Sequence, residues 1–553
     1  MSHIQNRSTE SIPEHPKYQI KNAVVNYFLL LMFSLFPLYL AIFADGNFPF
    51  IHFDNAFGSI RHDKYYLFLI LTGILLVVEV MLFVTYSEKT KSPDKLEHKK
   101  SIFSTFSFVD YAMLALLLTS AVSALFSPYI QTALFGEPNG RNNGLLLIVF
   151  YVIVYFLITR FYYYMEYVFA VFAAASAVVY LLSVLNGFYI DPLGTLSLLS
   201  AKQANDFIST IGNKNLLSSY ICISLPIIVC MSVHSKNKIA RIIYLVSAGF
   251  GFMSLMVSDS DSGILGIGVF LSVYLIVYSR KISRLKRYFL TLSVMLASAK
   301  ILRLFSLLMG DKYKEIGSLQ QMFVFSNQGF ILLGICALIT VLLYLADYKK
   351  PNLVLPKAVP VILSVLLAAA VIGVIAAVIY FSTVDTKTNL GSFERLLRFN
   401  DKWGTHRGYM WIRSMQIFGD ASIWQKLFGT GPDTFYYPFS PYFEGLQKFG
   451  DSSTNAAHNE YINYLITTGI FGLAAYLAFV GGAVVRAVKT AARNPIAIVF
   501  IAAVAGYSAQ AFVNISQPIT TPLFIIFVAL CEAVSRKSAL SYEAESRACT
   551  DLN

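Results

Sequence analysis

The sequence predicts an all-α protein: a polytopic transmembrane helical bundle with one long extracytoplasmic loop that itself contains helices. Two observations indicate this class. Of the 553 residues, 56% are hydrophobic and 13% are charged, whereas soluble domains have roughly 25% charged residues. Apolar runs also recur along the chain at about the 20 residues that a helix needs to cross a bilayer. The lipid bilayer is therefore an expected partner, and we expect a multi-pass protein of the cell membrane.

Runs of this kind number about fourteen. In chain order, we expect spans at 22–43, 65–86, 108–127, 144–159, 167–187, 215–232, 242–257, 263–279, 288–308, 327–346, 358–381, 461–485, 495–513 and 521–535. No small-residue cleavage site follows the first run, so we expect this run to be retained as a span. The chain then divides into three parts: an N-terminal transmembrane bundle at 1–381, a long extracytoplasmic loop at 382–457, and C-terminal transmembrane helices with a cytoplasmic tail at 458–553.

The basic residues predict the orientation. They cluster in alternate connections between the spans, at 89–100, 236–241, 280–287, 349–357 and 486–493. By the positive-inside rule these connections are cytoplasmic, and so are both termini. Because the clusters orient helices, the net charge of +12 does not indicate a nucleic-acid partner. Four of the five cysteines lie inside apolar runs, so we expect neither a disulfide nor a cysteine metal site.

Charged residues inside the spans should face protein or water, because lipid solvates charge poorly. They include Glu79, Lys300 and Arg303, for which the sequence identifies no partner.

The segment 382–457 is long for a connection, and such loops are usually functional, disordered or partly structured. Here the composition favours structure. Thr405 is positioned to cap a helix in which Arg407, Trp411 and Met415 share one face at helical spacing. The aromatic stretch 435–449 predicts either a belt at the membrane interface or a surface on which sugars stack.

His458 is the strongest candidate for chemistry, since it lies where the long loop meets an apolar run. An imidazole with an ordinary pKa of about 6.5 can accept a proton from a hydroxyl near neutral pH. The alternative is a surface histidine near a helix start. Asn459 and Glu460 follow His458. They either orient the ring or the acceptor, or they cap the next helix.

The order of these residues resembles that of the O-antigen ligase and polysaccharide-polymerase superfamily. The turn Gly429-Thr-Gly-Pro-Asp433 precedes His458-Asn-Glu-Tyr461, which matches the family's His-Asn-x-Tyr pattern. Arg407 stands four residues before a tryptophan and ahead of the Gly-x-Gly turn, as in the family. The resemblance spans most of the chain and is strongest from 399 to 476. It implies a membrane enzyme that uses polyprenyl-diphosphate-linked oligosaccharides as donors.

The resemblance also implies roles for the cations. A diphosphate leaving group needs charge neutralisation, which the planar guanidinium of Arg407 provides in a bidentate manner; the alternative is an interfacial arginine beside lipid headgroups. Arg141 and Lys214 lie in segments similar to two short outer-loop signatures of the family. They suit phosphate or sugar binding, or are cations that flank simple turns.

One turn departs from the family pattern. Where the family often has Ser-Arg, this chain has Ser260-Asp261, so an anion replaces a cation that contacts the diphosphate. This leaves open how the donor phosphates are held, and Lys214 or Arg141 are candidates to compensate. Asp259 and Asp261 also have the Asp-x-Asp spacing of metal-dependent glycosyltransferases. Nucleotide sugars are not expected outside the cell, so we expect no metal and no cofactor.

We therefore predict a metal-independent membrane glycosyltransferase with an extracytoplasmic active site. His458 would deprotonate the hydroxyl of a glycan acceptor, and Arg407 would stabilise the departing diphosphate. The span count favours a polymerase of surface polysaccharide repeats. The first alternative is a ligase that transfers the glycan to a different lipid or cell-envelope acceptor.

Two further alternatives belong to other classes. About fourteen spans also suit a flippase for lipid-linked oligosaccharides, although the polar chemistry is concentrated on one side. A scaffold that binds other polysaccharide-assembly proteins would explain the lost cation at Asp261.

Overall fold

The computed structural model describes residues 16–40, 56–87, 105–137, 141–310 and 312–550. Eleven helices in these ranges are long and apolar enough to cross a membrane. They are α1 (Pro16–Leu38), α2 (Ala56–Ser87), α3 (Phe108–Leu125), α6 (Glu166–Gly187), α8 (Lys214–His234), α9 (Lys238–Val257), α10 (Asp261–Tyr278), α11 (Ile282–Leu308), α13 (Asn327–Lys349), α14 (Ala358–Thr383) and α20 (Glu460–Thr490). Two shorter apolar helices are α5 (Leu145–Phe161) and α21 (Ile496–Ala511), and α22 (Thr521–Thr550) ends the described chain.

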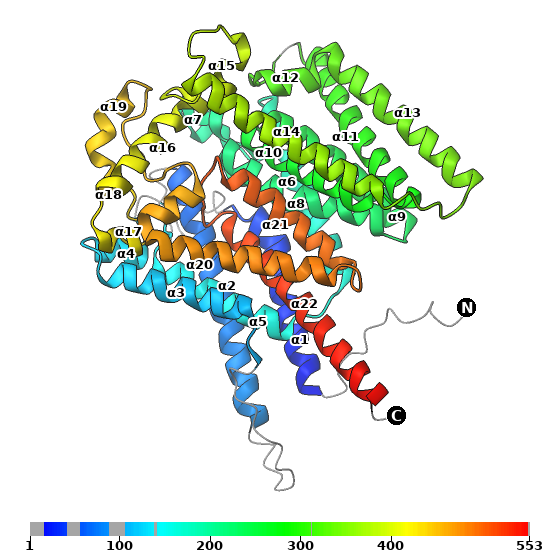
Figure 1. Ribbon diagram of the computed structural model, residues 1–553, viewed down its shortest axis with the longest axis horizontal. Coiled ribbons are helices and arrows are strands. Elements are labelled where there is room, and N and C mark those ends of the chain that lie inside the picture. Colours follow the sequence, from blue (N-terminus) through cyan, green and yellow to red (C-terminus); the bar gives the residue numbers. More distant parts are fainter. Residues whose placement is uncertain (1–15, 41–55, 88–104, 138–140, 311, 551–553) are drawn as a thin grey trace.

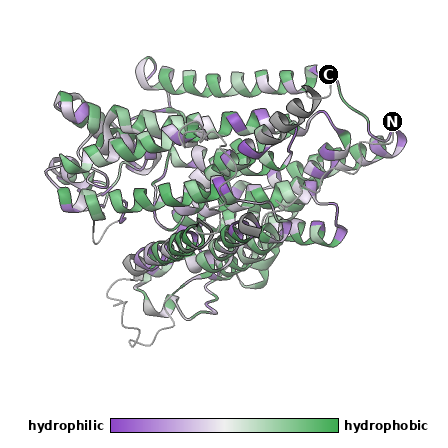
Figure 2. Ribbon diagram, turned by 90° about the horizontal axis from the view of Figure 1, so that it is seen from below, coloured by the Kyte–Doolittle hydropathy of each residue, from purple (hydrophilic) through white to green (hydrophobic). Residues whose placement is uncertain are grey.

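Each predicted span overlaps one of these helices, and hydrophobic residues predominate along them (Figure 2). The predicted all-α membrane bundle is therefore confirmed. The short helices connect the spans. They are α4 (Ile130–Phe135), α7 (Ala201–Asp206), α12 (Ser318–Val324) and the 3₁₀ turns η4 (Leu196–Leu198) and η5 (Ser209–Ile211).

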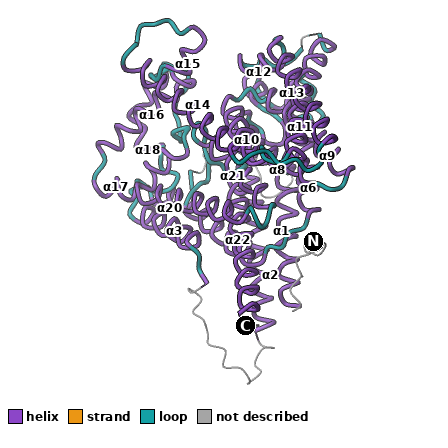
Figure 3. The backbone as a smooth tube through the Cα atoms, turned by 45° about the vertical axis from the view of Figure 1, so that its right-hand side comes forward, coloured by secondary structure: helices purple, strands orange, loops and turns teal. Residues whose placement is uncertain are grey.

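The long segment between α14 and α20 contains helices, as predicted. They are η6 (Gly391–Phe393), α15 (Glu394–Leu397), α16 (Trp403–Asp420), α17 (Ile423–Phe428), α18 (Tyr436–Phe439), η7 (Ser440–Tyr442) and α19 (Phe443–Gln447). Figures 1 and 3 show α16, α17 and α18 gathered at one end of the molecule, near the start of α20. We call this end the loop end.

The centre of the bundle is α8, whose span is buried along its whole length. A helix that is apolar on all sides is expected to be buried in this way. Its polar groups are paired inside the core: the Tyr220 hydroxyl lies 2.7 Å from Ser176 Oγ, and Ser224 Oγ lies 2.6 Å from the Tyr180 hydroxyl. At the other extreme, α14 has no residue that the protein buries.

The charged residues inside the spans have partners. Glu79 lies 3.4 Å from Lys21 of α1. Lys300 donates to the backbone carbonyls of Val324 at 3.1 Å and Ser326 at 3.0 Å. These carbonyls lie at the C-terminus of α12, where a cation complements the helix dipole.

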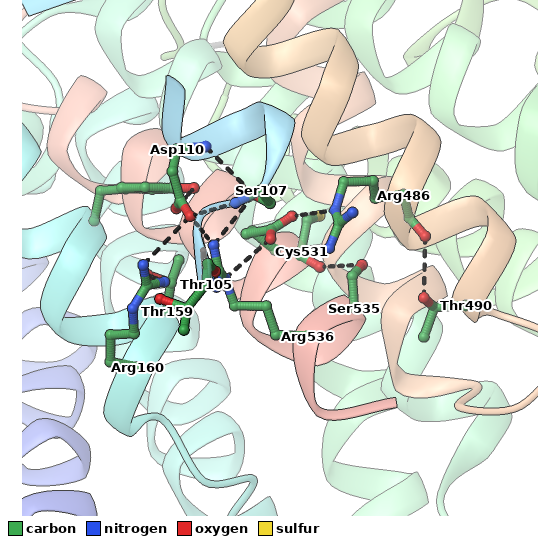
Figure 4. Close-up of polar contacts among 12 residues, drawn as sticks. Thr105, Ser107, Asp110, Thr159, Arg160, Arg486, Thr490, Cys531, Ser535 and Arg536 are labelled. Carbon is green, nitrogen blue, oxygen red and sulfur yellow. Dashed lines mark hydrogen bonds and ion pairs between the residues drawn. The ribbon is translucent and has the colours of Figure 1, made fainter. Parts of the chain in front are cut away.

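A buried ionic network joins four helices at the end of the bundle opposite the loop end (Figure 4). Asp110 of α3 and Glu532 of α22 are both fully buried, and Arg536 of α22 pairs with both carboxylates. Arg160 of α5 lies 3.3 Å from Asp110, and Arg486 of α20 lies 2.7 Å from Glu532. Each buried carboxylate thus has two cations, which compensate for the loss of water.

The two ends of α20 therefore carry different polar groups. Its start belongs to the loop end, and Arg486 belongs to the ionic network. At 1.5 Å per residue α20 covers at most about 40 Å between these groups, because it is kinked at Gly469.

The network predicts unequal costs for removing its members. Asp110→Ala leaves two half-buried arginines short of a counter-charge and removes the partner of the Ser107 N-cap, so we expect a loss of about 3–5 kcal/mol. Arg160→Ala should cost less, about 1 kcal/mol, because Arg536 still neutralises Asp110. Thermal unfolding of the detergent-purified protein measures both, and equal costs would contradict a shared network.

Candidate functional site

The turn at 429–433 lies directly against the backbone of α20. The Gly431 N–H donates to the Thr467 carbonyl at 2.9 Å. Gly429 and Gly469 have positive φ angles of 78° and 71°. A Cβ at Gly429 would lie 2.2 Å from the Thr467 carbonyl carbon. The backbones of the turn and of α20 therefore contact each other directly at Gly469, where α20 is kinked, and a side chain larger than that of glycine would not fit there.

Asp433, at the end of this turn, forms a buried ion pair with Arg141 from the connection between α4 and α5. The Arg141 Nη2 and Asp433 Oδ1 atoms are 3.6 Å apart, and each side chain is 1% exposed. Asp433 Oδ2 accepts the backbone N–H groups of Glu137 at 2.9 Å and Asn143 at 3.1 Å. Arg141 also donates to the Asn455 carbonyl. The pair therefore holds together three segments that are distant in sequence.

His458 is fixed by its neighbours on both sides. The Trp411 Nε1–H donates to the Ala457 carbonyl at 3.0 Å, which ties the residue before His458 to α16. The Asn459 side chain accepts the Ile462 N–H at 3.0 Å and caps α20. His458 itself has a φ of 50°, a left-handed backbone that costs about 1 kcal/mol or more. Such strain persists only where surrounding contacts hold it.

The His458 side chain lines a cavity of about 220 Å³ at the loop end. The start of α2, the segment 211–216 before and into α8, and the connection between α21 and α22 form its other walls. The hydrogen-bonding side chains in these walls are those of Arg61, Asn213, Asn215, Asn514 and Gln517. The cavity therefore brings together three distant parts of the bundle.

Burial lowers the pKa of His458 to about 3, and the charges of Arg407, Arg141 and His406 act in the same direction. The imidazole is therefore neutral across the physiological pH range. A neutral imidazole can accept a proton, which is what a general base requires.

Arg407 lies close enough to His458 for their charges to interact. Its Nη1 donates to the Gly404 carbonyl at 2.7 Å, and its Nε has no hydrogen-bond partner within the described structure. Burial lowers the pKa of Arg407, and the Asp261 carboxylate acts in the opposite direction.

Thr405 was predicted to cap this helix, but the residues 404–406 have left-handed φ/ψ angles inside α16. The cap prediction was wrong, and the regular helix follows this kink.

Lys214 and the turn at 258–261 form a polar group next to the cavity, where the Ser260 hydroxyl donates to Asn215 Oδ1 at 3.0 Å. Lys214 Nζ lies 3.9 Å from Asp259 Oδ2, and the Gly317 N–H donates to Asp259 Oδ1 at 2.5 Å. Gln320 Nε2 donates to Asp261 Oδ1 at 3.4 Å. Both carboxylates of the Asp-x-Asp pattern are thus engaged with the segment that contains α12.

Glu460 points into the bundle. It is buried, and it accepts the Tyr476 hydroxyl at 2.9 Å and the Tyr507 hydroxyl at 3.3 Å. Arg141, Asn459 and Glu460 therefore all have protein partners in this structure.

Sequence reasoning missed Arg61 and the amide side chains of Asn514 and Gln517. Arg61 lies just ahead of the predicted span at 65–86, and Asn514 and Gln517 lie in the short connection between the last two spans. The sequence offered one indication of these cavity residues, the amides clustered in the short connection between the last two apolar runs.

Two rings of the aromatic stretch 435–449 have a different role from either predicted one. Phe435 and Phe439 are fully buried and pack with Tyr409, Trp411 and Ile466 in a small core of their own. They attach the long segment to α20, so they neither form a membrane belt nor offer rings to a sugar.

The Asp433 pair predicts a large stability effect at the loop end. Asp433→Ala leaves Arg141 buried without its counter-charge, so we expect a loss of about 3–5 kcal/mol in thermal unfolding. The control is Asp401→Ala, because the Asp401 carboxylate is 45% exposed and lies 3.7 Å from Arg413. An exposed pair should contribute less than about 1 kcal/mol. Equal losses in the two variants would contradict a structural role for the buried pair.

No curated protein matched the chain. Residues 321–477 match the family described as O-Antigen ligase. The matched region runs from α12 through the long segment into α20, and it contains both Arg407 and His458. Residues 321–477 therefore carry an O-antigen ligase domain, which confirms the predicted relation of this chain to the O-antigen ligase superfamily.

Proposed function

We propose that this protein is an inverting membrane glycosyltransferase that transfers a glycan from a polyprenyl-diphosphate-linked donor. The observation that supports the proposal is a backbone-strained His458 that lines a polar cavity, together with an Arg407 whose charge acts on His458 and whose Nε has no partner within the described structure. Both residues lie in the O-antigen ligase domain. The lipid tail would lie among the spans, and the diphosphate would lie at the interface.

In the proposed step, His458 takes the proton from an acceptor sugar hydroxyl. The hydroxyl oxygen attacks the donor's anomeric carbon from the face opposite the diphosphate, so the configuration inverts. The bond between that carbon and the phosphate oxygen breaks, and its electrons stay on the lipid diphosphate. Arg407 stabilises this developing charge, and the proton leaves His458 for solvent. The step as written uses side chains alone and needs no metal.

Arg61 is the best placed second cation. It lines the same cavity as His458, so it would supply positive charge that the turn at Asp261 lacks. The Nδ2 group of Asn213 would donate to phosphate or sugar oxygens.

Removal of either principal residue tests the proposal. We expect His458→Ala to reduce glycan transfer about 10²–10⁴-fold, the usual effect of losing a general base. Arg407→Ala should reduce transfer about 10²–10³-fold, and Arg407→Lys should not restore it, because lysine lacks the bidentate geometry. Lys426→Ala, a cation of the same segment that donates to the Gly419 carbonyl, is the control. Transfer at the wild-type rate by either alanine variant, at equal membrane levels, would refute the assignment.

The pH dependence tests the electrostatics. With a pKa of about 3, His458 stays deprotonated down to about pH 4, so kcat/KM should be nearly constant between about pH 5 and 7. A base with an ordinary pKa of about 6.5 would lose about thirtyfold at pH 5. An acid limb near pH 6.5 in the free-enzyme profile would contradict the lowered pKa.

The choice between polymerase and ligase depends on the acceptor. We propose the polymerase, because the sequence predicts about fourteen spans and ligases of this superfamily tend to have about two fewer. One lipid-linked repeat unit, supplied as both donor and acceptor to the purified protein, separates the two. A ladder of products supports polymerisation, whereas product that forms only after a foreign lipid anchor is added identifies a ligase.

A further inference from the structure

A second cavity lies beside the reaction centre, and its size differs from that of the first. It measures about 1180 Å³ and lies between the segment 391–412, Phe449 and Ser318 of α12. The cavity at His458 has about 220 Å³, which is below the roughly 300–1,000 Å³ of pockets that hold a drug-sized ligand. The small cavity therefore suits the reacting groups alone, and the large one has room for several sugar rings.

The lining of the large cavity has the chemistry of a glycan site. Amide, carboxylate and ammonium groups come from Asn400, Asp401 and Lys402, and aromatic rings come from Trp403 and Phe449. Sugars present many hydroxyls, which such groups bind as donors and acceptors, and apolar ring faces, which stack on aromatic side chains. A lipid tail would need a mainly aliphatic wall.

The Trp403 ring is held in place from behind. Its Nε1–H donates to the Leu396 carbonyl at 3.0 Å, and its ring centroid lies 5.0 Å from that of Trp411. A ring that is fixed before the ligand arrives loses little freedom on binding.

The same tryptophan pair connects the large cavity to the reaction centre. Trp411 donates to the carbonyl of Ala457, the residue before His458. From Trp403, the three left-handed residues 404–406 lead directly to Arg407. The large cavity and the two reacting residues therefore share one continuous piece of structure.

We infer that this large cavity is an oligosaccharide subsite that holds the glycan chain of a substrate, with Trp403 as its stacking platform. The inference deepens the proposed transferase function and rests on it for the substrate class. The glycan belongs either to the donor or to the acceptor, and both present the same sugar chemistry.

Direct binding tests the subsite without catalysis. The probe is a set of radiolabelled, lipid-free oligosaccharides of one to three repeats, released by mild acid from the surface polysaccharide of the cells that make this protein. We expect saturable binding to the full-length protein in detergent, retained in His458→Ala. Trp403→Ala should weaken binding about tenfold, and Trp403→Phe, which keeps a ring, should restore most of it.

Matched controls separate the subsite from general damage. Trp424→Ala removes a tryptophan that packs on Phe428, outside the cavity. Lys402→Ala removes a lysine that lines the cavity, and Lys387→Ala removes a lysine outside it as the matched control. Neither Trp424→Ala nor Lys387→Ala should change binding. Wild-type affinity in both Trp403→Ala and Lys402→Ala would overturn the subsite, even if transfer still required His458. Binding through Trp403 without any glycan product would instead overturn the transferase proposal and leave the subsite standing.

The same oligosaccharides identify which glycan binds. If the wild-type protein extends them and Trp403→Ala does not, the subsite holds the acceptor. If they only inhibit transfer in competition with the donor, it holds the donor's glycan.

Discussion

The loop end depends on one buried ion pair. Arg141 and Asp433 are each 1% exposed, and a charge that loses its partner at such a depth is costly. Through backbone hydrogen bonds, the pair fixes the connection after α4, the glycine turn after α17 and the segment that leads to His458. The position of the candidate base is therefore set by a contact between parts of the chain that lie far apart in sequence.

The bundle supports this arrangement with a second ionic layer at its other end. Asp110 and Glu532 are shared by three arginines from α5, α20 and α22. The helix α20 connects the two ends, with His458 just before its start and Arg486 of the second layer near its end. A shift of α20 along its axis would therefore break backbone contacts at one end and buried ion pairs at the other. This coupling therefore fixes the position of the loop end relative to the rest of the bundle.

Much of the fold follows from local sequence, because hydropathy over about 20 residues depends on neither tertiary contacts nor partners. The spans and the helical nature of the long segment could be predicted for that reason. The partners of Arg141 and Lys300 could not, since they are backbone and side-chain groups on other segments. Phe435 and Phe439 were misread because an aromatic run looks the same whether it faces lipid, sugar or a small local core. The Thr405 cap failed because three consecutive left-handed residues cannot be foreseen from propensity.

The electrostatics of the candidate site give the proposed reaction an order. In the substrate-free protein, burial and nearby cations keep His458 neutral and weakly basic. A weak base takes a proton from a sugar hydroxyl with difficulty. A bound diphosphate would bring negative charge to Arg407 and so offset the positive charge that lowers the pKa of His458. The imidazole would then become a stronger base only after the donor has bound, and an acceptor hydroxyl, or water, would meet a poor base until that moment. The family often has an arginine where this chain has Asp261. A further arginine at that position, beside Arg407, would lower the basicity of His458 still more.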